Sequence, residues 1–201
     1  LFEHPRAKGS SGIVGFTADH GESFGRHQLW WTHHGLYPDQ LHVPLIVAGG
    51  GLPAGVMSAT PVEMVSLGST LLELAGLDSS QHPARPLDVR GDRAPEPRFA
   101  LGFSGEKAAI DHEGWLLILN LTEHDYELGP REFPKGGIEL YHVEADPACE
   151  HDLSEVETRR GERMKDALIR WLDDARPTGY ATVFNMSSEA VQRLQELGYG
   201  G

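Results

Sequence analysis

The chain has 201 residues, 39% of them hydrophobic, which is enough to bury the core of one large or two small globular domains. Its 30 acidic residues exceed its 17 basic residues, and the formal charge of −13 argues against nucleic acid or an anionic membrane as a partner. Cys149 is the single cysteine, so the sequence excludes an internal disulfide and a cysteine-rich zinc site. No apolar stretch approaches the roughly 20 residues of a membrane-spanning helix. Because the sequence starts at Leu1 without a charged and apolar leader, we expect a processed or truncated chain, and localisation signals could lie upstream.

Two apolar runs in the N-terminal part predict buried strands. The first, SGIVGFTAD, covers residues 11–19, and the second, HVPLIVAGGG, covers residues 42–51 and is closed by glycines. Continuous apolar runs of this kind suit strands that are covered on both faces, as in a parallel sheet. We therefore expect an α/β fold for this part of the chain.

A helix is predicted after the second strand, in TPVEMVSLGSTLLELAG at residues 60–76. Thr60 suits the N-cap position, with Pro61 at the first helical position and Glu63 completing a capping box. Gly76 suits the C-terminal cap. The order strand, loop, strand, helix is typical of an α/β sheet.

The second half of the chain predicts a different architecture, beyond a Pro- and Arg-rich stretch at residues 82–98. Four short strand-like runs separated by turns indicate a small antiparallel sheet; they cover residues 98–105, 107–111, 114–121 and 137–143. A helix is expected over about residues 154–175, where apolar residues from Val156 to Leu168 recur at roughly helical spacing. A last helix is expected over residues 187–198.

Histidines and carboxylates gather after the first predicted strand. In an open α/β sheet, ligands collect beyond the carboxyl ends of the strands, which is where Asp19 and His20 follow the first run. A carboxylate and an imidazole there could both reach one metal ion. His33 lies in the loop that returns to the second strand, so both loops could open on the same edge of the sheet. One pocket could then hold a metal and a cationic group that binds an anion.

Five blocks follow one another along nearly the whole chain: TADHGESFG, HHGLYPDQLHVPLIV, PVEMVSLGSTLLELAGL, ELYHVEADPACEHDLS and LQELGYGG. The ordered set resembles the C-terminal half of a sulfatase, within the alkaline-phosphatase-like superfamily. The resemblance implies an α/β fold class with two parts. Residues 1–96 would form the C-terminal part of the catalytic α/β sandwich. Residues 97–201 would form a small α+β subdomain with a four-stranded antiparallel sheet and packed helices.

The resemblance also implies roles for individual residues. Asp19 and His20 match the late pair of metal ligands in such enzymes. His33, with His34 as its close competitor, matches the lysine or histidine that contacts the sulfate or phosphate group and its leaving oxygen, so both are catalytic and substrate-binding candidates. Glu22 is expected to orient His20 or the loop from behind the metal ligands.

Further expectations concern the cofactor, the nucleophile and the substrate. The resemblance implies a divalent metal, calcium before manganese, magnesium or zinc. The nucleophile in such enzymes is a formylglycine made in a C-x-P-x-R-type motif, or a plain Ser or Thr in phosphatase relatives, and this sequence contains no match. Cys149 is interpreted as a thiol in a turn. The fragment alone is therefore expected to be inactive, and the full-length protein to hydrolyse a small-molecule or carbohydrate sulfate ester, with His27 at the substrate pocket.

Three alternatives stay open. The same framework serves phosphate or phosphonate ester hydrolysis, or phosphoryl transfer, in the same superfamily. A non-catalytic remnant or interaction domain is suggested by the missing nucleophile and by VSLGSTLL, where relatives usually read VDLAPTLL. Gly68 there costs a helix about 1 kcal/mol relative to alanine and indicates drift. A zinc site in an unrelated binding protein could use four histidines: His20, His27, His33 and His34.

Overall fold

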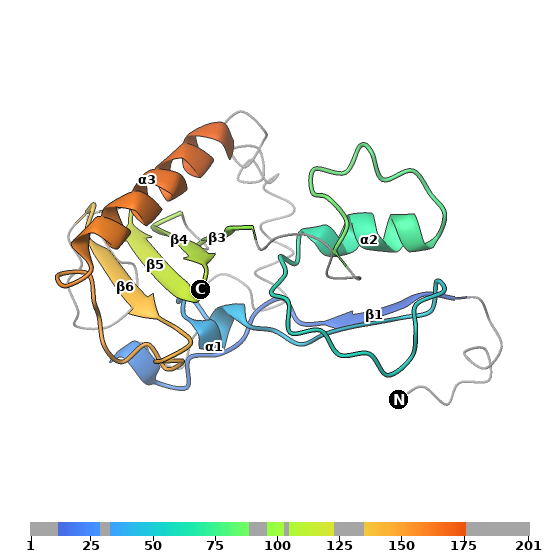
Figure 1. Ribbon diagram of the computed structural model, residues 1–201, viewed down its shortest axis with the longest axis horizontal. Helices are drawn as coiled ribbons and strands as arrows, with labels where there is room; N and C mark the ends of the chain where they lie inside the picture. Colours follow the sequence, from blue (N-terminus) through green and yellow to red (C-terminus); the bar gives the residue numbers. More distant parts are fainter. Residues whose placement is uncertain (1–11, 29–32, 89–95, 103–104, 123–134, 176–201) are drawn as a thin grey trace, which may run out of the picture.

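The computed structural model describes residues 12–28, 33–88, 96–102, 105–122 and 135–175. The last predicted helix, residues 187–198, lies outside these ranges. Within them, no helix combines the length and apolar character that crossing a membrane requires. The strands form a four-stranded sheet and a two-stranded ribbon. Figure 1 shows a long helix lying along the larger sheet and a shorter helix beside the ribbon.

The expected antiparallel sheet in the second half of the chain is confirmed. Its strands are β3 (Arg98–Leu101), β4 (Lys107–His112), β5 (Trp115–Asn120) and β6 (Ile138–His142), hydrogen-bonded in the order β3-β4-β5-β6. Leu117 of β5 pairs with Ile110 of β4 and with Leu140 of β6. All three side chains are buried, so the middle of the sheet lies in the hydrophobic core.

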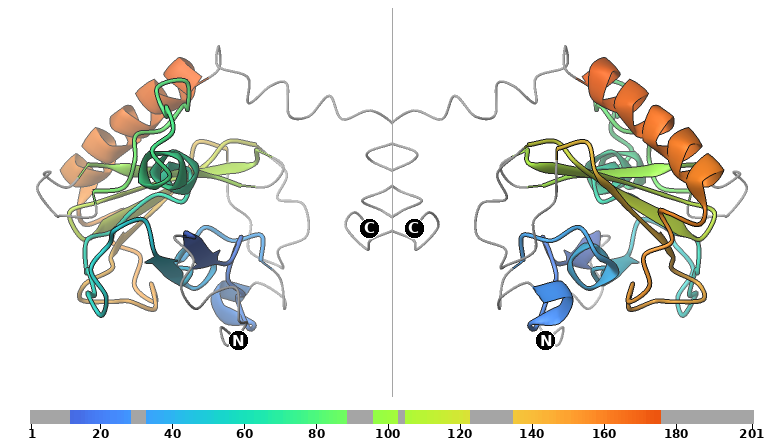
Figure 2. Two further views of the ribbon diagram at one scale, coloured as in Figure 1. Left: turned by 90° about the vertical axis from the view of Figure 1, so that its right-hand side faces the viewer. Right: turned by 90° about the vertical axis from the view of Figure 1, so that its left-hand side faces the viewer.

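This sheet is covered on both faces, which explains why its strands are apolar at consecutive positions. On one face lies α3 (Thr158–Ala175), as Figures 1 and 2 show. Its buried Leu168 packs with Leu117 and Leu140. On the other face, Tyr37 packs in a second core cluster with Ile118 of β5. Because residues 36–37 share a core with the sheet, the two parts of the chain are packed together, and a domain boundary at 96–97 stays a prediction.

The helix α3 is described as far as Ala175, the last residue of its described range, and it begins later than Ser154. Residues 153–157 form turns instead, in which the amides of Val156 and Glu157 both donate to the carbonyl of Leu153. Val156, predicted to face the core, is 76% exposed. A helical start at Ser154 is therefore wrong.

The two N-terminal strands pair differently from the parallel arrangement that their composition suggested. β1 (Val14–Thr17) and β2 (Leu45–Ala48) are antiparallel neighbours, with Phe16 opposite Ile46. The intervening chain, with the short helices η1 (Arg26–Gln28) and α1 (Pro38–Leu41), folds back on itself and permits direct pairing. Phe16 and Ile46 are 47% and 59% exposed, so this face of the ribbon is not covered by the described residues.

The other face of the ribbon is covered by α2 (Ser66–Leu74), as Figure 1 shows. The predicted N-terminus of this helix is wrong, because it begins at Ser66 and Val65 occupies the N-cap position. Glu63 does not complete a capping box; its Oε1 accepts a hydrogen bond of 2.8 Å from the amide of Phe99 and so ties the helix start to β3. The predicted C-terminus is confirmed: Gly76 has φ +71°, and the amide of Leu77 donates to the carbonyl of Leu72 in a Schellman motif.

Gly68 in α2 has a packing role, which corrects its interpretation as drift. A Cβ atom at this position would lie 2.6 Å from Nε2 of His82. The His82 ring is held there because its Nδ1 lies 3.3 Å from the amide of Ala84. Nearby, Oγ1 of Thr70 accepts a hydrogen bond of 2.8 Å from the amide of Leu87. The small and polar residues of α2 therefore dock the 82–87 segment.

We expect Gly68→Ala to lower the free energy of unfolding, measured by urea denaturation. Alanine favours a helix by about 1 kcal/mol over glycine, but overpacking costs about 1–3 kcal/mol, so a net loss of up to about 2 kcal/mol is expected. In a His82→Ala background the same substitution should be neutral or stabilising, because the clashing ring is gone. Stabilisation of equal size in both backgrounds would contradict this packing role.

Cys149 is a buried thiol at the edge of the Tyr37 core, as its sequence context indicated. It is 2% exposed, and its backbone φ of +51° places it in the left-handed region. Burial, together with the charge of Asp146 and other acidic groups, raises the pKa of the thiol to about 12. The protonated form therefore prevails in the folded chain at neutral pH.

At pH 8 we expect Cys149 to react with an uncharged alkylating reagent at least about a hundredfold more slowly in the native chain than in urea, since a buried thiol with this pKa holds little thiolate.

The raised pKa of Cys149 also makes the stability of the fold depend on pH. Its contribution is complete below the ordinary pKa of 9.0 and declines as pH rises toward 12, because the thiol ionises more readily in the unfolded chain. A Cys149→Ala chain should lack this alkaline loss of stability; equal losses in both chains would assign it to other groups.

Candidate functional site

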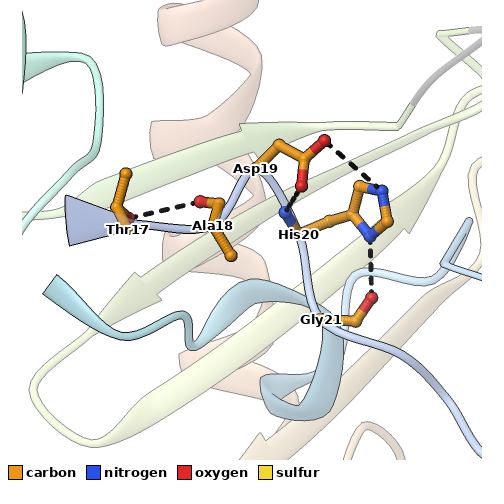
Figure 3. A network of polar contacts seen from close by, with 5 residues as sticks. All are labelled: Thr17, Ala18, Asp19, His20 and Gly21. Carbon is orange, nitrogen blue, oxygen red and sulfur yellow. Dashed lines mark hydrogen bonds and ion pairs between the residues drawn. The ribbon is translucent and has the colours of Figure 1, made fainter. Parts of the chain in front are cut away.

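Asp19 and His20 lie just beyond the end of β1, where the carboxylate and the imidazole are adjacent (Figure 3). Oδ1 of Asp19 accepts a hydrogen bond of 3.0 Å from the His20 amide, while Oδ2 lies 3.7 Å from Nε2 of the imidazole. Nδ1 of His20 is 2.8 Å from the carbonyl oxygen of Gly21. Because a carbonyl only accepts, Nδ1 carries the proton, and in the neutral ring Nε2 keeps its lone pair on the side of the carboxylate.

His33 and His34 lie against the same pair. The rings of His33 and His20 stack with centroids 4.0 Å apart and an interplanar angle of 17°. His34 meets His33 edge-on at 4.7 Å. The pKa of His33 is lowered by burial and by the neighbouring His20 and His34, against the opposing charges of Glu22 and Asp19. The loops after β1 and before β2 thus bring these three histidines together.

The 19–22 loop is held by the backbone of α1. The amides of Gly21 and Glu22 donate to the carbonyls of Gln40 and Asp39, at 2.8 and 3.1 Å. A Cβ atom on Gly21 would lie 1.9 Å from the carbonyl oxygen of Asp39, so only glycine permits this approach. The carboxylate of Glu22 accepts a hydrogen bond of 3.1 Å from the Ser23 amide. The Glu22 carboxylate therefore contacts the backbone of its own loop, and its role in orienting the loop or His20 stays a prediction.

Asp39 faces inward beside this clamp. Burial raises the pKa of its carboxyl group, and nearby Arg26 opposes the rise. Both carboxylate oxygens of Asp39 are buried. Its backbone carbonyl, by contrast, is used by Glu22. The residue therefore contributes to the site through its main chain.

His27 lies in a different environment from the other three histidines. Its ring stacks on Tyr37, with centroids 3.7 Å apart and an interplanar angle of 7°. It also lines a cavity of about 350 Å³ together with Arg26, Tyr141 and Cys149. In the described part of the chain no group of three or more His, Cys, Asp or Glu residues is arranged to hold a metal. The four-histidine zinc site therefore does not form among these residues, and substrate contact by His27 stays a prediction.

A buried polar cluster behind α1 was not anticipated from the sequence. The hydroxyls of Tyr37 and Tyr141 both donate to Oε2 of Glu139, at 2.8 and 2.5 Å. Glu139 is only 3% exposed. The available signal was a glutamate in the strand run IELYH, where burial on both faces obliges a carboxylate to find donors.

Sequence comparisons relate the chain to sulfatases. A family model described as Sulfatase matches residues 6–77. A protein of Formosa agariphila called Sulfatase is 39% identical over 137 residues, which are 66% of this chain and 25% of the relative. Arylsulfatase K of Danio rerio is 33% identical over 97 residues, 46% of this chain and 18% of the relative. The chain thus spans well under half the length of these relatives.

Comparisons of structure agree at the level of the fold. A structure solved in complex with its substrate D-glucosamine-2-N,6-O-disulfate aligns with a TM-score of 0.60 and 19% identity, over 82% of this chain and 34% of the other. A phosphonate monoester hydrolase from Silicibacter pomeroyi aligns with a TM-score of 0.53 and 18% identity, over 88% of this chain and 35% of the other. The mixed α/β fold class expected from the sequence is confirmed. Sequence and fold together relate the chain to the sulfatases of the alkaline-phosphatase-like superfamily.

Proposed function

We propose that this chain forms one side of the active site of a sulfate ester hydrolase. Asp19 and His20 would supply two ligands to a divalent metal, and His33, with His34 beside it, would contact the sulfate group and its leaving oxygen. The observation that carries the proposal is the stack of His33 on His20, whose Nε2 lone pair and the Asp19 carboxylate face each other beyond β1. The nucleophile would come from outside this chain, because the sequence has no C-x-P-x-R-type motif.

The residues present fit a metal as part of a larger ligand set. The separation of 3.7 Å between Oδ2 of Asp19 and Nε2 of His20 is within the range for two ligands that each lie about 2.0–2.5 Å from one ion. The Gly21 carbonyl fixes the tautomer that leaves Nε2 available, as backbone partners of metal-binding histidines do. When bound, a divalent ion neutralises charge on the ester oxygens. We expect calcium from the family resemblance, with manganese, magnesium or zinc as alternatives.

His33 and His34 would act on the leaving group. An imidazole within hydrogen-bonding reach of the ester oxygen lowers the barrier by donating a hydrogen bond or a proton as the S–O bond breaks. The stack fixes the plane of the His33 ring relative to His20, and the His34 ring closes its edge. These contacts restrict the ring before substrate arrives, which reduces the entropic cost of reaching the reactive geometry.

The substrate class is proposed as a small-molecule or carbohydrate sulfate ester. Support comes from the names of similar proteins: a Δ4,5-hexuronate-2-O-sulfatase of Bacteroides thetaiotaomicron is 27% identical over 84% of this chain and 37% of its own length. A second candidate is a phosphate or phosphonate ester, because the same fold occurs in the phosphonate monoester hydrolase. The two tetrahedral oxyanions could use the same metal and imidazole framework.

Binding of Mn²⁺ to the 201-residue chain tests the metal ligands. We expect added Mn²⁺ to broaden the NMR signals of residues 19–22 first, and His20→Ala to weaken binding at least about tenfold, because an imidazole ligand is lost. His151→Ala is the matched control: His151 also lies beside an aspartate, with Nδ1 3.4 Å from Oδ2 of Asp146, but outside the proposed site. Equal affinity in the wild type and His20→Ala, or equal loss in both variants, would rule out the assignment.

Activity of the full-length protein tests the role of His33. We expect His33→Ala to reduce kcat/KM by about 10²–10⁴ for an alkyl sulfate, whose poor leaving group needs a proton, and much less for 4-nitrophenyl sulfate. An equal loss for both esters would exclude a role at the leaving oxygen. Comparing 4-nitrophenyl sulfate with the corresponding phosphate and phosphonate separates the two candidate functions. Absence of turnover on all of them would favour a non-catalytic remnant or interaction domain.

A further inference from the structure

Three buried residues connect the small sheet to the segment that carries the site; we call Tyr37, Glu139 and Tyr141 the tyrosine–glutamate latch. Glu139 and Tyr141 belong to β6, whereas Tyr37 precedes α1. The exposed fractions of all three side chains are 3% or less. Oε2 of Glu139 accepts the Tyr37 hydroxyl at 2.8 Å and the Tyr141 hydroxyl at 2.5 Å.

The latch has a rigid end in the sheet. Glu139 pairs with Ile118 of the central strand β5, and Leu140 next to it is completely buried against α3. A carboxylate in such a position cannot move toward water without disturbing two core clusters. Its acceptor oxygen is therefore a fixed point to which the Tyr37 hydroxyl is tied.

From Tyr37 the connection continues through α1 to the loop of residues 19–22. The carbonyl of Tyr37 accepts hydrogen bonds from the amides of Gln40 and Leu41, which form the turn of α1. The carbonyls of Asp39 and Gln40 in this turn then accept the amides of Glu22 and Gly21. The placement of Tyr37 thereby sets the position of the loop that holds Asp19 and His20.

The same tyrosine also lies close to the histidine side of the site. His33 and His34 precede Tyr37 by one short loop, so the latch anchors the end of their segment. The ring of His27 stacks on the Tyr37 ring, and the φ of +56° at His27 is a conformation that surrounding contacts must stabilise. One buried residue thus adjoins both loops that meet at the His20–His33 stack.

We propose that Tyr37 and Glu139 are positioning residues: the latch holds the loop of residues 19–22 in register with His33, from the opposite side of α1. A role of the latch in catalysis rests on the proposed function, whereas its effect on the loop depends only on contacts within the chain. Neither residue belongs to the proposed metal ligands or substrate contacts. Their effect passes through the backbone of α1 to Gly21 and Glu22.

Amide hydrogen exchange of the 201-residue chain, followed by NMR, tests the proposal without metal or substrate. In Tyr37→Phe the ring and its packing remain while the bond to Glu139 is lost, and we expect the Gly21 and Glu22 amides to exchange at least about tenfold faster. The His20–His33 stack should loosen as well, seen as a loss of the nuclear Overhauser effect between the two rings. Tyr141→Phe is the matched control, because it removes the other hydroxyl from the same acceptor atom without touching the loop segment.

The outcomes are distinct. Faster exchange at Gly21 and Glu22 in Tyr37→Phe, with little change in Tyr141→Phe, supports the latch. Leu168→Ala, which weakens the core on the α3 side of the sheet, shows what a general loss of stability does to the same amides. Equal acceleration in all three variants, or no protection of these amides in the wild type, would overturn the proposal. Because no metal is added, the result does not depend on whether Asp19 and His20 bind one.

Discussion

The hydrogen bond between Tyr37 and Glu139 joins residues that are 102 positions apart in the chain, and the arrangement of the site depends on it. Moving a carboxylate out of water is expensive, and the cost is offset only when its oxygens are well bonded. A hydrogen bond to a charged group contributes about 1.5–3 kcal/mol, so a Glu139 deprived of a donor would be strongly unfavourable. The folded sheet and the placement of α1 are therefore coupled: each supplies a group that the other needs.

The two-sided core around β5 explains why this coupling is possible. Leu117 faces α3, while Ile118 faces the segment of Tyr37, so consecutive residues of one strand belong to different clusters. A strand buried on both faces is rigid, and its neighbour β6 shares that rigidity through the ladder of backbone bonds. A site built from loops gains precision when the loops are tied to such a strand. Here the tie is made by polar groups, whose directional bonds fix orientation as well as distance.

What the sequence predicted, and what it did not, follows from the range of the interactions. The sheet of β3 to β6 and the Gly76 cap depend on local patterns, and both are confirmed. The role of Glu63 was wrong because its carboxylate finds the amide of Phe99, a contact that no local pattern contains. The glycine at position 68 is likewise explained by the ring of His82, which comes from another segment and leaves no room for a Cβ atom. Asp19, His20 and His33 could be predicted as site residues because the sequence blocks around them resemble those of sulfatases in the same order. The hydrogen bond between Tyr37 and Glu139 could not be predicted, because the two residues lie 102 positions apart.

The electrostatics of the proposed site follow from the same geometry. A chain with a net charge of −13 repels an anionic ester at long range, so attraction must arise locally. Burial and the neighbouring rings of His20 and His34 lower the pKa of His33, which disfavours its imidazolium form. The histidines are therefore better suited to offer directional hydrogen bonds than to supply most of the positive charge. Under the proposed function that charge falls to the metal, and the precision with which Asp19 and His20 are held becomes decisive, since a displaced ion would no longer face the oxygen that His33 contacts.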